Sequence, residues 1–217
     1  MTKKEKVLEI QKVFSKVYPE ADCTLDYTEP LHLLIATQLA AQCTDARVNL
    51  VTPALFSKYP TAADFAAADI KELEGYIYST GFYHNKAKNI IACCQMIIDR
   101  FGGEVPSTME ELTSLPGVGR KTANIIIGDI HHKPAIVVDT HCKRIAKRLG
   151  LTKNSDPTKV EFDLLKIVPP EYSYIFCHQI VYHGRAYCKS QSPSCDSCPL
   201  SELCPKIGVK KNNQNHQ

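Results

Sequence analysis

The sequence of 217 residues lacks a long apolar segment. A membrane-spanning helix needs about 18 or more consecutive apolar residues, whereas the stretch 31–41 is interrupted by His32, Thr37 and Gln38. The N-terminus carries charged residues with no apolar segment after them, and it is not rich in arginine and serine. We therefore expect no membrane span, no secretory signal and no organellar transit peptide.

The sequence also has little net charge, only +3 at pH 7. A value this small does not by itself indicate a nucleic-acid partner. The charges are unevenly distributed, however: residues 20–80 carry a net charge of −6, and residues 115–148 carry a net charge of +5. The basic segment could attract a polyanion, although a solvated helix face would show the same pattern.

Sustained alternation of apolar and polar residues is absent, which excludes a fold built on β-sheets. The run 135–138 is β-branched but too short to found a sheet. Apolar residues instead repeat at intervals of three and four, and we expect an all-α protein. The predicted helices cover residues 7–17, 31–41, 46–58, 70–77, 86–101, 108–115, 120–127, 141–149, 157–167 and 170–182. Their predicted N-caps include Asp45, Asp69, Asn85, Ser107 and Asp139.

Ten cysteines are present without a secretion signal, which argues against a disulfide framework. Four of them fall within 17 residues, at Cys188, Cys195, Cys198 and Cys204, and prolines between them predict a loop. Four thiolates this close need a bound metal group. Their spacing leaves zinc and a [4Fe–4S] cluster both open. The other six cysteines are expected to be small apolar core residues.

Residues 115–123, Leu-Pro-Gly-Val-Gly-Arg-Lys-Thr-Ala, join two short predicted helices through a Gly-x-Gly turn. The glycines allow a sharp bend and a close approach to a ligand. The turn leads into a helix N-terminus, which attracts anions, and Arg120 and Lys121 add positive charge there. This segment is suited to gripping a DNA phosphate without reading sequence. A hairpin selected only for tight packing is the alternative.

These motifs together resemble the helix-hairpin-helix DNA glycosylases that carry an iron–sulfur cluster. The resemblance rests on residues 115–123, on Val-Asp-Thr-His at 138–141 and on the four clustered cysteines, and it extends over residues 39–45, 81–87 and 183–185. Their order and spacing agree from about residue 5 to 205. The resemblance implies two helical lobes with a cleft between them and a C-terminal loop in which Cys188, Cys195, Cys198 and Cys204 hold a [4Fe–4S] cluster.

Under this resemblance, residues 23–133 form a six-helix lobe that carries the hairpin. Residues 1–22 and 134–211 form the cluster lobe, and residues 212–217 are a frayed tail.

The same resemblance implies two catalytic residues. Lys121 would be the nucleophile that forms a Schiff base, and its place at a helix N-terminus disfavours the ammonium form of such an amine. Asp139 would be the essential carboxylate, because a fixed negative charge stabilises the positive charge that develops on the sugar. We expect the two side chains to face each other across the cleft. The alternative roles are a phosphate-binding lysine and a helix N-cap.

Further residues are expected to contact DNA. Gln42 and Phe82 would fill the space left by a base rotated out of the duplex, although Phe82 could equally be a core aromatic. The remaining predicted contacts are Gly117, Val118, Gly119, Arg120, Lys143, Arg144 and Arg185.

The implied function is that of a bifunctional DNA N-glycosylase and lyase, a monomer that acts on double-stranded DNA containing an oxidised pyrimidine or an abasic site. The expected location is the bacterial or archaeal cytoplasm, in association with the nucleoid. Three alternatives stay open: a non-catalytic DNA-binding module, a glycosylase of the same family for pyrimidine dimers or mismatches, and an iron–sulfur electron carrier.

Overall fold

The computed structural model describes residues 1–209, and the predicted tail at 212–217 lies outside them. Helices are the regular elements of the described residues, in which no strand is found, and the all-α fold is confirmed. No helix among these residues has the length and apolar character that crossing a membrane requires. The chain divides into two compact units, Cys23–Lys133 and the combination of Met1–Asp22 with Pro134–Gln217.

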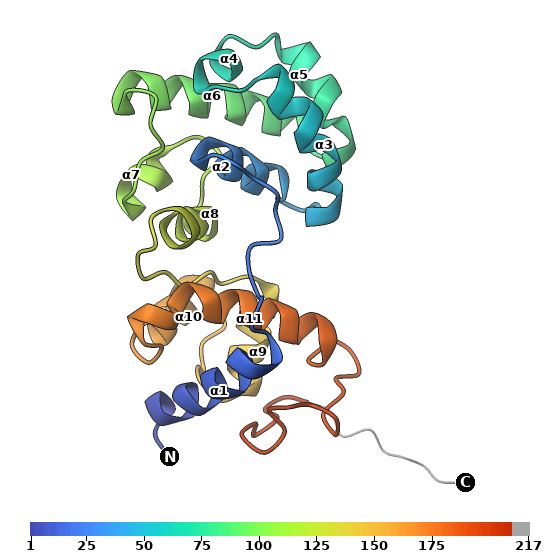
Figure 1. Ribbon diagram of the computed structural model, residues 1–217, viewed down its shortest axis with the longest axis vertical. Helices are drawn as coiled ribbons and strands as arrows, with labels where there is room; N and C mark the ends of the chain where they lie inside the picture. The colour runs from blue at the N-terminus through green and yellow to red at the C-terminus, as the bar shows by residue number, and fades with distance from the viewer. Residues whose placement is uncertain (210–217) are drawn as a thin grey trace, which may run out of the picture. The chain divides into compact units, whose positions relative to one another are not determined.

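The unit Cys23–Lys133 contains seven α-helices and two short irregular helices within its described length. They are α2 (Pro30–Leu39), α3 (Asp45–Lys58), α4 (Ala62–Ala66), α5 (Ile70–Ile77), η1 (Tyr78–Thr80), α6 (Tyr83–Phe101), α7 (Met109–Ser114), α8 (Arg120–Ile125) and the π-helical η2 (Ile126–Ile130). The long helix α6 packs against α4 and α5, and α2 lies between α6 and α8 (Figure 1). Since every side chain of α2 from His32 to Leu39 is buried, this helix forms the centre of the unit.

The second unit packs the N-terminal helix against the C-terminal part of the chain. Its elements are α1 (Lys3–Val17), α9 (Thr140–Arg148), α10 (Pro157–Leu165), η3 (Pro170–Tyr172) and α11 (Ser173–Ala186), followed by a loop that runs to residue 209. Phe14 of α1 and Phe176 of α11 are fully buried and in ring contact. Helix α11 also packs on α9 (Figure 1). The apolar core therefore fixes the helices from which the cysteine loop extends.

Several predicted helix ends agree with the structure. Asp69 caps α5 by accepting hydrogen bonds from the backbone N–H groups of Lys71 and Glu72. Gly102 ends α6 in the left-handed conformation, as glycine commonly does at this position.

Three predicted caps are wrong by one to three residues. Thr44 caps α3 in place of Asp45, Thr108 caps α7 in place of Ser107, and α6 begins after Phe82 and not at Asn85. In the first two cases the neighbouring threonine hydroxyl occupies the capping position, and in the third the helix begins without a side-chain cap. The short helix α4 was not predicted, and the helix predicted over 120–127 passes into the π-helical segment at Ile126.

Candidate functional site

The Gly-x-Gly turn is a tight hairpin between α7 and α8, and its two glycines serve different purposes. Gly117 has φ +76°, and a Cβ there would lie 2.7 Å from Oε1 of Gln38 and 2.9 Å from Cβ of Asn89. Gly119 has an ordinary φ of −100° and open space where a Cβ would be. Gly117 therefore allows the hairpin to pack on α2 and α6, while Gly119 leaves the entrance to α8 uncovered.

The residues around these glycines divide between the interior and the surface. Val118 is buried, and its backbone N–H donates to the Leu115 carbonyl at 3.1 Å, so this amide closes the turn. Arg120 and Lys121 begin α8, which has no side-chain N-cap, and the Lys121 side chain is exposed. The turn thus presents a lysine at a helix N-terminus, as the sequence predicts.

Asp139 is the N-cap of α9. Its Oδ1 accepts a hydrogen bond of 2.6 Å from the backbone N–H of Cys142, and the residue is half-buried. Capping fixes the carboxylate in position and leaves its second oxygen available for another role. Lys121 belongs to the unit Cys23–Lys133 and Asp139 to the other unit, so their facing each other stays a prediction.

Gln42 and Phe82 both lie in the left-handed backbone region, with φ of 56° and 49°. Gln42 follows α2, and Phe82 precedes α6. Both are exposed, and 62% of the Phe82 surface is accessible to solvent. The exposure excludes the alternative that Phe82 is a core aromatic. Non-glycine residues with positive φ cost conformational energy, and they concentrate at functional sites.

The basic side chains of α9 and α11 divide into two groups, one exposed to solvent and one that points into the protein. Lys143 and, further along the chain, Arg185 are exposed. Arg144 donates from Nε and Nη2 to the Cys188 carbonyl at 3.1 and 3.0 Å, and burial lowers the pKa of its guanidinium. Arg148 is buried and donates to the carbonyls of Lys189 and Ser190 at 2.6 and 2.9 Å. These two arginines therefore hold the cysteine loop, a role that the charge pattern did not predict.

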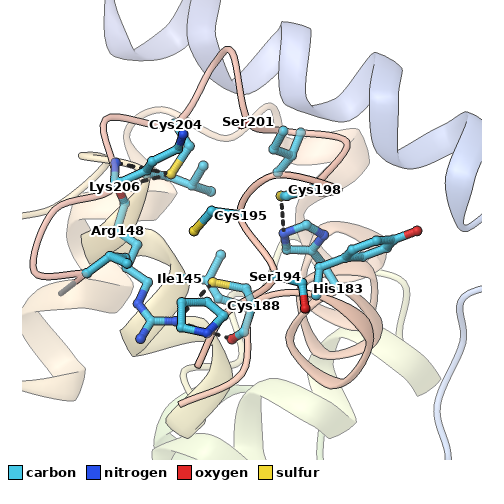
Figure 2. A pocket seen from close by; sticks show the side chains of 15 residues that line it. Ile145, Arg148, His183, Cys188, Ser194, Cys195, Cys198, Ser201, Cys204 and Lys206 are labelled. Atoms are coloured by element: carbon cyan, nitrogen blue, oxygen red, sulfur yellow. Dashed lines mark hydrogen bonds between the residues drawn. The ribbon is translucent and has the colours of Figure 1, made fainter. Parts of the chain in front are cut away.

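The four clustered cysteines line one hollow in the loop after α11 (Figure 2). Their side chains point into it from different parts of the loop, with Ile145 and Arg148 of α9 and His183 of α11 also lining it (Figure 2). The other six cysteines divide into two groups. Cys93, Cys94, Cys142 and Cys177 are buried as expected, whereas Cys23 and Cys43 are partly exposed.

The separation of the four sulfurs bears on which of the two metal groups fits the loop. Tetrahedral zinc with Zn–S bonds of about 2.3 Å brings thiolates to about 3.8 Å from one another. Among the described residues, no three of these cysteine sulfurs lie within 4.8 Å of one another. Burial raises the pKa of the Cys198 and Cys204 thiols, so their ionisation needs a bound cationic group. The donor set therefore fits a group larger than a single zinc ion.

Hydrogen bonds to three of the sulfurs come from around the hollow. Nη1 of Arg148 lies 3.3 Å from Sγ of Cys188, and the Lys206 backbone N–H donates to Sγ of Cys204 at 3.3 Å. Nε2 of His183 lies 3.6 Å from Sγ of Cys198. Such contacts orient metal ligands and stabilise thiolate charge.

His183 is itself held from its other side. The Tyr18 hydroxyl lies 3.2 Å from Nδ1 of His183, and burial lowers the pKa of this imidazole to about 4. A neutral imidazole carries one N–H, so a hydroxyl that donates to Nδ1 leaves the proton on Nε2, facing Cys198. The sequence contains His183 in its His-Gly-Arg segment, but no pattern in it points to Tyr18.

Comparison with known proteins agrees with this geometry. Residues 35–170 match the HhH-GPD superfamily of base excision DNA repair proteins. The chain is 52% identical to endonuclease III of Synechocystis sp. over 206 residues, which is 94% of each chain. Two solved structures, a non-covalent endonuclease III–DNA complex and a trapped covalent endonuclease III–DNA intermediate, each superpose with a TM-score of 0.89 and 47% identity, over 95% of this chain and 97% of theirs.

The resemblance inferred from the sequence motifs is thereby confirmed. With the Gly-x-Gly hairpin, the helix-capping Asp139 and the four-cysteine loop following one another along the sequence, the chain belongs to the endonuclease III branch of the HhH-GPD base excision DNA repair superfamily.

Proposed function

We propose that this chain is a DNA glycosylase and abasic-site lyase that removes oxidised pyrimidines from double-stranded DNA and nicks the strand by β-elimination. The observation that carries the proposal is the exposed Lys121 at the uncapped start of α8, in a chain 47% identical to an endonuclease III that was trapped covalently on DNA. A covalent intermediate requires a nucleophile, and an amine forms one with a sugar carbon.

In the proposed reaction, the damaged nucleotide rotates out of the duplex, because stacking otherwise shields its C1′ atom. The unprotonated amine of Lys121 attacks C1′, and the base leaves with the electron pair of the glycosidic bond. The sugar ring opens to an imine. Loss of a proton from C2′ then expels the 3′ phosphate, which nicks the strand and makes Lys121 responsible for both activities.

Asp139 supports this chemistry with a carboxylate held at the start of α9. Its hydrogen bond to Cys142 limits its rotation, so the charge is fixed before substrate arrives. Positive charge develops on the sugar as the base leaves, and a fixed carboxylate stabilises it. The same group can move protons to and from the lysine.

Gln42 and Phe82 are proposed to occupy the space left by the rotated nucleotide. An amide can pair with the base that has lost its partner, and an aromatic ring can stack in the gap. Lys143 and Arg185 are exposed and suited to phosphates, as is the hairpin 117–120. Arg144 stays a predicted contact, but its guanidinium is already engaged with Cys188.

We further propose that Cys188, Cys195, Cys198 and Cys204 hold a [4Fe–4S] cluster. Two observations support this assignment: among the described residues no three of these sulfurs lie within 4.8 Å of one another, and the chain is 52% identical to an endonuclease III. When bound, the cluster would cross-link the loop after α11. We propose that the protein acts as a monomer, and that it is cytoplasmic, since its relatives are bacterial.

Borohydride trapping tests the proposal. Wild-type protein incubated with an abasic duplex should give a covalent adduct in denaturing gels, and Lys121→Ala should abolish it, while Lys71→Ala, which removes an exposed lysine from α5, should not. No adduct with the wild-type protein would leave a non-catalytic DNA-binding module. A panel of lesion-bearing duplexes then separates oxidised pyrimidines from dimers and mismatches.

A further inference from the structure

Lys86 is a lysine of α6 whose side chain points into the protein. Only 6% of its surface is accessible, and its ammonium donates to the Leu39 carbonyl at 2.7 Å and to the Thr80 carbonyl at 2.8 Å. All three residues belong to the unit Cys23–Lys133. The ammonium therefore joins two chain segments that are 41 residues apart in the sequence.

The two carbonyls lie where helices end. Leu39 is the last residue of α2, and Thr80 is the last residue of η1. Carbonyl groups at a helix end lack partners within the helix and carry partial negative charge. A cation between them satisfies both at once, whereas a neutral apolar side chain would leave both buried without a hydrogen bond.

Each carbonyl belongs to a residue that precedes, by two or three positions, a residue proposed to enter the DNA. Gln42 is three residues after Leu39, and Phe82 is two residues after Thr80. Both Gln42 and Phe82 have positive φ and exposed side chains. A non-glycine residue persists in that backbone region only where the surrounding structure holds it. Lys86 provides such a restraint at the base of both loops.

We propose that Lys86 is a positioning residue that holds the Gln42 and Phe82 loops at a fixed separation, so that both side chains enter the duplex together. This inference rests on the proposed function, in which those two side chains fill the space left by the rotated nucleotide. Burial lowers the pKa of the Lys86 amine, which agrees with its confinement between the carbonyls and away from solvent. Lys86 touches neither the sugar nor the leaving base in this scheme.

The test compares two DNA substrates. Base removal from a lesion-bearing duplex requires the space in the stack to be filled, whereas β-elimination at an abasic site in single-stranded DNA does not. Lys86→Met keeps the length of the side chain and removes the ammonium. We expect its single-turnover rate on the duplex to fall by about tenfold or more, as small misplacements do, with an unchanged rate on single-stranded abasic DNA.

A matched control is available on the same helix, because Lys88 of α6 is exposed and Lys88→Met should leave both rates unchanged. Fluorescence of 2-aminopurine placed next to the lesion should rise less with Lys86→Met than with the wild-type protein, because less of the damaged nucleotide is rotated out of the stack. Adding Lys86→Met to the double variant Gln42→Ala, Phe82→Ala should lower the duplex rate little further, since all three act through one step.

Equal losses of rate on both substrates, or losses that multiply in the triple variant, would overturn the proposal and leave Lys86 a purely structural residue. If Lys86→Met melts below the assay temperature, Lys86→Gln, whose amide is too short to join both carbonyls, is measured with the same criteria. Failure of the wild-type protein both to remove the lesion from the duplex and to form the borohydride adduct with an abasic duplex would instead reject the proposed function.

Discussion

The unit Cys23–Lys133 and the cysteine loop at 187–209 reach a defined structure in different ways. The first buries aliphatic or aromatic side chains from each of its seven α-helices, so hydrophobic burial stabilises it. In the loop, Leu200 is the one described residue that is classed as buried. Arg144 and Arg148 hold the loop's backbone through hydrogen bonds, and the proposed iron–sulfur cluster would join its four sulfurs. A segment that contributes one buried side chain to the core therefore depends on polar and metal cross-links.

Removing one cluster ligand should separate the two regions most clearly. We expect Cys195→Ser to lose the visible absorption of the iron–sulfur group and to become sensitive to proteases within 187–209, because no apolar core remains to order that loop. The unit Cys23–Lys133 should stay resistant. Absorption spectra and limited proteolysis measure both effects, and Cys23→Ser serves as the control. A protease-resistant loop without the absorption band would contradict the comparison.

Arg148→Met should have the next largest effect. The substitution removes the guanidinium that donates to the carbonyls of Lys189 and Ser190 through two partly buried hydrogen bonds. The free energy of unfolding should fall by about 1–3 kcal/mol, as expected when several partly buried hydrogen bonds from one charged group are lost. Urea denaturation measures it. Lys147→Met, at the exposed neighbouring position, should change it little, and similar losses in both variants would argue against this role for Arg148.

Gly117→Ala tests the packed unit by steric fit. The residue has a φ of +76°, and the added Cβ would clash with Gln38 and Asn89. We therefore expect Gly117→Ala to lower the free energy of unfolding by about 1–3 kcal/mol. Gly119→Ala has open space and should cost less than about 1 kcal/mol. Thermal or urea unfolding distinguishes them. Equal effects of the two substitutions would show that the hairpin does not depend on close packing at Gly117.

The smallest effect is expected from Tyr18→Phe. Loss of the hydroxyl removes the partner that sets the His183 proton toward Cys198 and should weaken that contact by about 1 kcal/mol. Release of iron to a chelator, followed by the decay of visible absorption, should be faster by about fivefold. Tyr172→Phe, on η3, is the control, and release at the wild-type rate would remove Tyr18 from the cluster's surroundings.

Sequence patterns predicted local features and motifs better than side-chain directions. The Asp69 and Asp139 caps depend on residues two or three positions away, so a short segment contains the necessary information. The caps at Asp45 and Ser107 were wrong because an adjacent threonine competes for the same position. Arg144 and Lys143 look alike in the sequence, yet one binds the Cys188 carbonyl and the other is exposed.

The order of the hairpin, the aspartate and the four cysteines in the sequence was enough to indicate the family and its helical fold, because each motif is a short segment with its own chemistry. Tertiary structure alone decided that Lys86 lies between two helix ends, that Arg148 points into the cysteine loop and that Tyr18 reaches His183. These contacts join residues that are far apart in the chain, and such distances are set by the packing of whole helices, which no local pattern records.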